Sequence, residues 1–232
     1  MARISKSDLT KLEIIRVATR MFLEKGYSKT TIKAISDELG MSTGNLTFYF
    51  PTKEYLLGAL VEMLIDFQWE EMKKDAHEGI SSVLALCFEL TSMASACEAD
   101  ETIKDFYLSA YKSEITLDMI RRNDAKRARE VFGQYCSDWT DEQYAEAEML
   151  VSGIEYATLM TTESSASLEM RITGALDTIL SIHNVPKELR NEKIKKCLSM
   201  DYRAAGKKVL DEFRNYVHDT SYKALEQLLK GI

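Results

Sequence analysis

Residues 30–53 read TTIKAISDELGMSTGNLTFYFPTK and contain the pattern that decides the fold. The first half predicts a short helix, because apolar residues recur at steps of three and four from Ile32 to Leu39. Thr31 is placed to cap the start of this helix. Gly40 follows its end, where a C-cap favours a residue that tolerates left-handed dihedral angles. The segment therefore ends in a tight turn.

A second short helix is predicted directly after this turn. Ser42 or Thr43 is placed to cap it, and Pro51 ends it. Leu46 and Phe50 are four residues apart and share its inner face. Two helices joined by a short turn with glycine form a helix-turn-helix, whose second helix enters the major groove of DNA. Helical corners that bind no DNA have the same pattern, so both interpretations stay open at this point.

The outer face of the second helix carries no charge, so base edges can approach it without repulsion. Asn45 can make a bidentate contact to adenine, and Thr43, Thr47 and Phe48 can touch a thymine methyl group. Lysines and tyrosine beside this face are expected to position phosphates. The full set of expected DNA contacts is Thr31, Lys33, Ser42, Thr43, Gly44, Asn45, Thr47, Phe48, Tyr49 and Lys53.

A family resemblance rests on these same residues. The run T-T-I-x-x-I-x-x-x-L-G-M-S-x-G-x-L is followed by Y-F at 49–50, K-E at 53–54 and L-L at 56–57. Together with RVATRMFLEKGY at 16–27, it resembles the TetR/AcrR family of bacterial transcriptional regulators over residues 9–65. The family usually has tyrosine where this chain has Thr47. The contact that this tyrosine makes with the phosphate backbone of DNA is therefore not expected here.

The rest of the chain predicts only helices. Two prolines and ten glycines occur in 232 residues, and no long alternating strand pattern is present. We expect an all-α fold, with a three-helix, homeodomain-like head over 1–53, a connecting helix over 53–78 and a helical body over 79–232. Further helices are expected near 9–25, 80–97, 115–137, 141–162, 165–183, 187–198, 201–218 and 220–230. Another segment opens at Asp100-Glu101 and carries Ile103, Phe106, Tyr107 and Tyr111.

The charge distribution agrees with a DNA-binding head. The chain carries a net charge of −7, but its first 60 residues hold nine Lys or Arg against six Asp or Glu. A basic head on an acidic body suits a DNA-binding domain joined to a part that avoids DNA. The charged run RRNDAKRARE at 121–130 is interpreted as a solvated helix face.

Other chemistry is not indicated by the sequence. No metal-ligand, Walker or nucleophile-elbow spacing occurs, so we expect neither an enzyme nor a bound cofactor. The four cysteines show no C-x-x-C spacing, and without a signal peptide they indicate free thiols in a cytoplasmic protein. No uncharged run approaches the ~18 apolar residues of a membrane span.

The middle of the body is rich in aromatic residues and methionine. Such residues usually fill a core, but they also line apolar ligand pockets between bundle helices. The candidate ligand contacts are Phe88, Phe106, Tyr107, Tyr111, Met119, Tyr135, Trp139, Tyr156 and Met160.

The resemblance implies a homodimeric regulator, usually a repressor, whose operator affinity changes when a small effector binds the body. It also implies that the helices near 141–162 and 165–183 form the dimer contact. The expected contact residues are Ala145, Met149, Ser152, Gly153, Ile154, Ala157 and Met160, with the aliphatic stripe from Leu168 to Ile182. The alternative is a helical ligand-binding or interaction module that reads DNA weakly or not at all.

Overall fold

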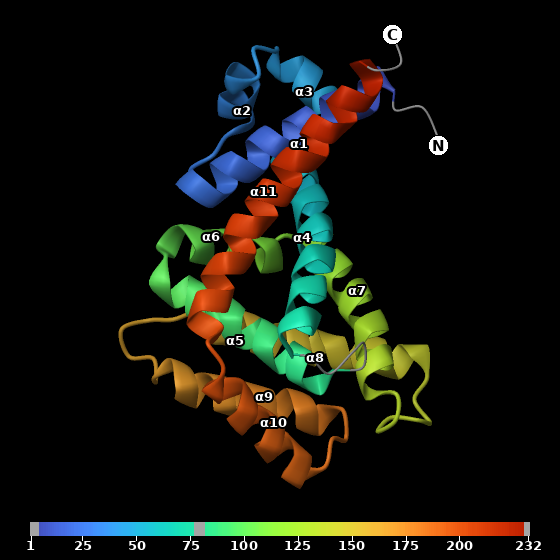
Figure 1. The fold of residues 1–232 in the computed structure, drawn as a ribbon, viewed down its shortest axis with the longest axis vertical. Coiled ribbons are helices and arrows are strands. Elements are labelled where there is room, and N and C mark those ends of the chain that lie inside the picture. Colours follow the sequence, from blue (N-terminus) through green and yellow to red (C-terminus); the bar gives the residue numbers. More distant parts are fainter. Residues whose placement is uncertain (1–4, 77–81, 230–232) are drawn as a thin grey trace.

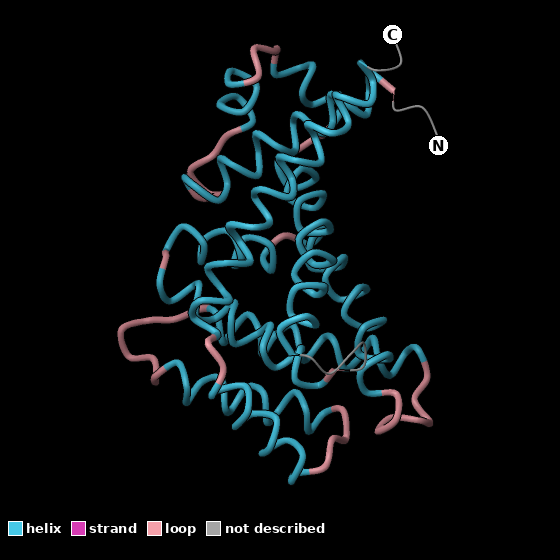
Figure 2. The backbone as a smooth tube through the Cα atoms, in the orientation of Figure 1, coloured by secondary structure: helices cyan, strands magenta, loops and turns pink. Residues whose placement is uncertain are grey.

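The computed structural model describes the backbone of residues 5–76 and 82–229, with side chains up to Thr220. Every regular element within these residues is an α-helix (Figure 1, Figure 2), which confirms the predicted all-α fold. The helices are α1 (Lys6–Lys25), α2 (Ile32–Glu38), α3 (Thr43–Tyr49), α4 (Lys53–Ala76), α5 (Val83–Ala99), α6 (Glu101–Lys112), α7 (Glu114–Phe132), α8 (Asp141–Leu159), α9 (Leu168–Ile182), α10 (Lys187–Ser199) and α11 (Tyr202–Leu229).

Helices α1 to α3 form a small head at one end of the elongated molecule, and α9 and α10 lie at the other end (Figure 1). Helix α1 begins three residues before the expected Leu9, because Ser5 and Asp8 form a capping box at its start. Phe22, Ile35 and Leu46 of the three head helices have no exposed surface. The head is therefore built around a few fully buried side chains.

Helix α4 leaves the head and runs into the body, where it packs against α5 and α7. Its described part ends at Ala76, and the expected break at Gly79 lies outside the described residues. One continuous cluster of buried side chains extends from Ile14 in α1 to Val217 in α11. Head and body therefore share a continuous core.

The C-terminal segment differs from the expectation of two helices over 201–218 and 220–230. The described residues form a single helix, α11, which runs from the body back along α1 (Figure 1). No glycine or proline occurs between Gly206 and Gly231, so nothing in the segment interrupts the helix. Phe213 is fully buried in α11, and its ring lies 5.7 Å from Phe67 of α4.

Helix α9 corrects the expected dimer contact. Leu168, Ile172 and Ile179, which belong to the aliphatic stripe predicted for the interface, are buried inside the subunit. Helix α9 packs against α10, α8 and α5, so the same chain covers this stripe. The face that α9 leaves exposed includes Met170 and Gly174 instead.

The loop between α7 and α8 is longer than expected. The helix predicted over 115–137 ends at Phe132 with Gly133 at its C-cap, and the amides of Tyr135 and Cys136 turn back to the Phe132 carbonyl. Helix α8 begins with a capping box formed by Thr140 and Gln143. The Gln143 amide donates to the Thr140 hydroxyl, and the Thr140 amide donates to the Gln143 side chain.

Candidate functional site

The turn between α2 and α3 has the geometry of a helix-turn-helix. The Thr31 hydroxyl accepts from the Ala34 amide at the start of α2, and Ser42 caps α3 in the same way. Gly40 has φ +64°, the left-handed conformation expected at this position. The Ser36 and Thr43 hydroxyls lie 3.2 Å apart across the turn, so they fix the angle between the two helices.

The outer face of α3 is uncharged and open. Asn45 and Gly44 are exposed, and Phe48 is 79% exposed, which is unusual for so large an apolar side chain. The Phe48 ring contacts only the neighbouring Tyr49 ring among described aromatic residues, at 5.3 Å between centroids. The Thr47 hydroxyl donates to the Gly44 carbonyl at 3.2 Å. A strip of small polar groups with one projecting aromatic ring therefore faces outward.

The two candidate lysines differ in their surroundings. Lys33 is exposed, and its ammonium group forms an ion pair with Asp37 at 2.8 Å, one turn further along α2. Lys53 instead donates to the carbonyl oxygens of Tyr27 and Thr30, at 3.1 and 3.0 Å, and lies 3.9 Å from the Tyr27 ring centroid. Burial lowers the pKa of Lys53. Lys53 therefore holds the loop between α1 and α2, a structural role that the sequence did not indicate.

A second contact ties this loop to the body. Asp105 of α6 accepts from the Ser28 amide at 2.8 Å and from the Ser28 hydroxyl. Gly26 lies directly beside it with φ +90°, and a Cβ atom there would come within 2.8 Å of the Asp105 carboxylate. The loop thus requires glycine for its conformation and for the close approach of α6.

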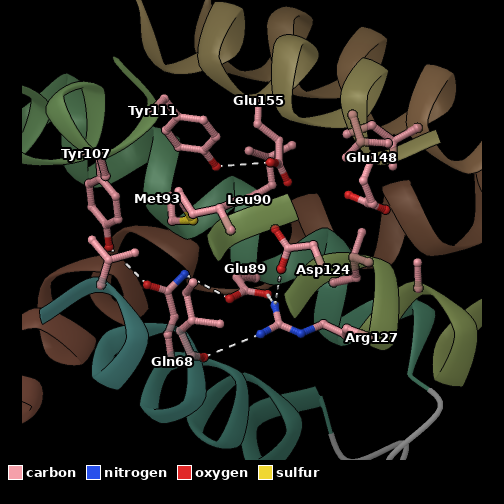
Figure 3. Close-up of a pocket in the computed structure, with 18 of the residues that line it drawn as sticks. Gln68, Glu89, Leu90, Met93, Tyr107, Tyr111, Asp124, Arg127, Glu148 and Glu155 are labelled. Atoms are coloured by element: carbon pink, nitrogen blue, oxygen red, sulfur yellow. Dashed lines mark hydrogen bonds and ion pairs between the residues drawn. The ribbon is translucent and has the colours of Figure 1, made fainter. Parts of the chain in front are cut away.

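The body encloses a cavity of about 80 Å³ between α4, α5, α6, α7, α8 and the end of α9. Figure 3 shows its polar side chains pointing toward one another from these helices. Its apolar wall includes Leu64, Leu90, Phe106, Ile120, Val151 and Ile179. Its polar lining is Gln68, Glu89, Tyr107, Tyr111, Asp124, Arg127, Glu148, Glu155 and His183.

One side of this cavity is a hydrogen-bonded network centred on Arg127. Its guanidinium group lies 2.8 Å from Glu89 and 3.6 Å from Asp124. Gln68 of α4 donates to Glu89 at 3.1 Å and accepts from the Tyr107 hydroxyl at 3.0 Å. The network therefore links α4, α5, α6 and α7.

Arg127 also contacts helix α4 directly. Its guanidinium group donates to the Ile65 carbonyl at 3.4 Å and lies 4.5 Å from the Trp69 ring centroid. Arg127 therefore links the carboxyl groups of the cavity to α4, the helix that leaves the head.

The opposite side of the cavity holds two further carboxyl groups from α8. The Tyr111 hydroxyl donates to Glu155 at 3.0 Å, and Glu148 lies 3.7 Å from Nε2 of His183. Burial raises the pKa of Glu148 to about 9 and that of Glu155 to about 8, and the Asp124 carboxylate adds to both rises. Both groups therefore carry protons near neutral pH.

The structure brings three of the nine candidate ligand residues to the cavity: Phe106, Tyr107 and Tyr111. The other six lie outside its lining. Phe88 is buried in the core, Met119 packs on Gly58 and Trp139 packs on Tyr144. The Tyr156 ring lies beside the Tyr111 ring. Tyr135 is half-buried, and Met160 is 47% exposed.

The charged lining was not predicted from the sequence. The run at 121–130 was expected to be a solvated face, but Asp124 and Arg127 turn inward from it. Glu148 and Glu155 are seven residues apart, which places them on one face of α8. This spacing could have indicated that the two glutamates lie on one face of the helix, but it does not show that this face is buried.

Comparison with known proteins agrees with the geometry of the head. The family model described as "Bacterial regulatory proteins, tetR family" matches residues 14–60, which include α2, the turn and α3. Residues 14–60 form a TetR-family domain. The resemblance noted from the sequence is thereby confirmed, and the TetR-family match covers the head and the start of α4.

Two curated relatives and one solved structure illustrate the extent of the likeness. The chain is 30% identical to the HTH-type transcriptional regulator HbdR of Aromatoleum sp. (strain CIB), over 47% of each chain. It is 24% identical to the HTH-type transcriptional repressor KstR2 of Rhodococcus jostii (strain RHA1), over 44% of this chain and 50% of that protein. The matches thus span about half the length of these TetR-type regulators.

The solved structure of the TetR-family protein CprB from S. coelicolor A3(2) is 22% identical. The alignment covers 88% of this chain and 98% of that chain, with a TM-score of 0.43.

Three further observations concern the described residues alone. Within 5–76 and 82–229, no group of three or more His, Cys, Asp or Glu side chains is arranged to hold a metal ion. In the same part of the chain, no helix has the length and apolar character needed to cross a membrane. All four cysteines are buried thiols.

Proposed function

We propose that this TetR-family chain is a sequence-specific DNA-binding transcriptional regulator whose operator affinity is controlled by a small molecule in the body. The observation that carries the proposal is the outer face of α3, where Asn45 and Phe48 project without charge from a capped helix-turn-helix. Helices α2 and α3 stand at the end of the molecule, free of the body (Figure 1).

The test is a gel-shift titration of the full chain with the DNA upstream of its own gene, against a scrambled duplex of equal length. We expect binding that is tighter to the upstream DNA by at least about 10³-fold. Equal affinity for both duplexes would contradict sequence-specific binding and favour the alternative of a helical module that no longer reads DNA.

Replacement of Asn45 with alanine is expected to relax base preference at one or two operator positions. A bidentate contact to adenine contributes about 1–3 kcal/mol of discrimination. The matched control is Lys33→Ala on the exposed face of α2. Loss of a phosphate contact there weakens binding to all DNA sequences alike. It also reduces the slope of log affinity against log salt concentration by about 1. Binding selection on a randomised operator measures both, and an unchanged preference of the Asn45 variant contradicts its base-reading role.

The contact between Asp105 and Ser28 is expected to transmit changes in the body to the head. Helix α6 carries both Asp105 and two cavity residues, Tyr107 and Tyr111. Replacement of Asp105 with alanine removes the acceptor of the Ser28 amide, so hydrogen exchange over residues 26–30 should accelerate by about tenfold or more.

Asp118→Ala is the control for this variant, because Asp118 is 69% exposed on α7. Mass spectrometry of the deuterated peptides measures the exchange. If residues 26–30 exchange at the same rate in the Asp105 variant as in the parent, the loop is held by other contacts.

A homodimer is expected through the exposed faces of α8 and α9. Met149 and Leu150 are more than half exposed on α8, and Met170 is 68% exposed on α9. A Cβ atom at Gly153 or Gly174 would meet nothing within 4 Å, so a second subunit can approach both backbones closely.

Gly153→Arg together with Gly174→Arg should convert the dimer to a folded monomer, measured by sedimentation at micromolar concentration. Glu62→Arg, on the exposed face of α4, is the control and should leave the dimer intact. A folded double variant that still sediments as a dimer would place the interface elsewhere.

A further inference from the structure

The cavity contains more acidic than basic groups. Four carboxyl groups line it, Glu89 from α5, Asp124 from α7, and Glu148 and Glu155 from α8, together with a single guanidinium group. Arg127 is already engaged by Glu89 at 2.8 Å and Asp124 at 3.6 Å. Among the described residues, neither Glu148 nor Glu155 has a lysine or arginine within ion-pair distance.

A second observation is that a buried acceptor, Nε2 of His183, has no donor within hydrogen-bond distance. Nδ1 of His183 lies 2.9 Å from the Ile179 carbonyl oxygen, so Nδ1 carries the proton and Nε2 is an acceptor. Nε2 is buried without a hydrogen-bond partner, and the His183 side chain is 1% exposed. The facing Glu148 carboxyl group is 3% exposed and 3.7 Å away, too far for a hydrogen bond.

Buried polar atoms almost always have a hydrogen-bond partner, so Nε2 of His183 marks a place where a donor is missing. The missing group must donate hydrogen bonds, and the surrounding carboxyl groups favour one that carries positive charge.

The size and walls of the cavity limit the ligand. Its volume of about 80 Å³ is well below the ~300 Å³ or more of typical ligand pockets. A compact group enters the cavity without unfolding the body of the protein. A ligand that carries a larger group must separate the helices. Phe106, Tyr107 and Phe132 add aromatic side chains to the lining of the cavity.

We propose that this cavity binds a compact organic cation with N–H donors, an alkylammonium or guanidinium group, between Glu148, Glu155 and His183. The inference rests on the proposed function, because it names the chemical class of the effector. An anionic ligand would meet four carboxyl groups and an arginine that is already paired. Among the described residues, the carboxyl groups are not arranged as a metal site.

The protonation states of the groups around the cavity predict how the affinity for a cation changes with pH. The titratable groups facing the cavity are Glu89 from α5, Tyr107 and Tyr111 from α6, Asp124 and Arg127 from α7, Glu148 and Glu155 from α8, and His183 after α9. Burial raises the pKa of both tyrosines and lowers that of His183, so these three stay neutral near pH 7.

Glu148 and Glu155 hold protons near pH 7 in the empty cavity, with pKa values of about 9 and about 8. Asp124 has a pKa of about 6. A bound cation favours the ionised carboxylates, so binding releases protons and its affinity rises with pH. A neutral ligand that accepts hydrogen bonds from the protonated carboxyl groups has the opposite dependence.

The experiment compares n-butylammonium with its neutral counterpart 1-butanol, using calorimetry and the fluorescence of Trp69, which lies beside Arg127. An alkylammonium group has a pKa near that of lysine, about 10.4, so the probe keeps its charge up to pH 8. We expect n-butylammonium to bind more tightly than 1-butanol by more than about tenfold at pH 8. Its affinity should fall by about tenfold for each proton released as the pH is lowered by one unit.

The variants are Glu148→Gln and Glu155→Gln, which keep side-chain shape and remove the charge. Each variant should lower the affinity for n-butylammonium by about tenfold or more and leave the affinity for 1-butanol unchanged. The control is Glu146→Gln, an exposed position on the same helix, which should change neither. Thermal melting checks that each variant is folded.

Three outcomes would overturn the proposal: equal binding of the two probes, an affinity that falls as pH rises, or cation binding that is unaffected in both Gln variants. Preferential binding of Mg²⁺ or Mn²⁺ at the same residues would also overturn it. The gel shift with upstream DNA is measured in parallel. Specific DNA binding without cation binding contradicts the effector class alone, whereas loss of specific DNA binding contradicts the proposed function.

Discussion

Replacing Arg127 with leucine is expected to lower the free energy of unfolding by about 3–5 kcal/mol near pH 8, because it leaves buried carboxylates without their cation. The side chains of Arg127 and Glu89 are 12% and 11% exposed, so water does not replace the lost contact. The loss should be smaller at pH 5. Burial already raises the pKa values of Glu89 and Asp124 above their usual range, and without the opposing Arg127 they rise further, so the variant loses additional stability as pH rises.

Urea unfolding at pH 5 and pH 8 measures this difference. Arg122→Leu is the matched control, since Arg122 and its partner Asp118 are both 69% exposed on the same helix. It should change stability by less than about 0.5 kcal/mol. The double variant Arg127→Leu with Glu89→Leu should recover most of the loss, because apolar side chains often replace a buried pair without penalty. A loss that is the same at both pH values would mean that the lost packing against Trp69, and not charge, dominates.

Replacing Gly206 with alanine is expected to destabilise the chain by about 2–3 kcal/mol, opposite in sign to the usual effect of glycine to alanine in a helix. Gly206 is buried in α11, where a Cβ atom would overlap the Ser92 carbonyl oxygen and come within 3.4 Å of Ala96. The backbone of α5 cannot move aside without disturbing its own hydrogen bonds. Helix α11 must therefore shift along its whole contact with α5 and α1.

Gly174→Ala is the control, because a Cβ atom at Gly174 meets nothing within 4 Å. It should change the stability of the folded monomer by less than about 1 kcal/mol, in the stabilising direction. Thermal melting of both variants in the background of Gly153→Arg, which opposes the proposed dimer and leaves position 174 unchanged, separates the two effects. Stabilisation by Gly206→Ala would contradict the close approach of α11 and α5.

The head could be predicted from the sequence because its signals act over three or four residues. The Thr31 and Ser42 caps, the left-handed Gly40 and the inward Leu46 each depend on their immediate neighbours in the chain. The outer face of α3 follows from the same periodicity, and the TetR-family match covers these residues. Most helices of the body were predicted on the same local grounds, although the last two predicted helices form one, α11.

The cavity could not be predicted in this way. Its polar lining comes from α4 to α8 and the end of α9, so it depends on which helices meet. Asp124 and Arg127 lie in a charged run that suits solvent, and only the packing of α7 against α4 and α8 turns them inward.

The sequence by itself determined an all-α chain with a helix-turn-helix head, since caps, turns and helical periodicity are short-range properties of the chain. Only the tertiary structure decided that α11 returns to the head, that the Leu168–Ile182 stripe is covered within the subunit, and that carboxyl groups meet inside the body. The physical reason is that a helix presents several faces of similar hydrophobicity, and the face that becomes buried is chosen by neighbours far away in the chain.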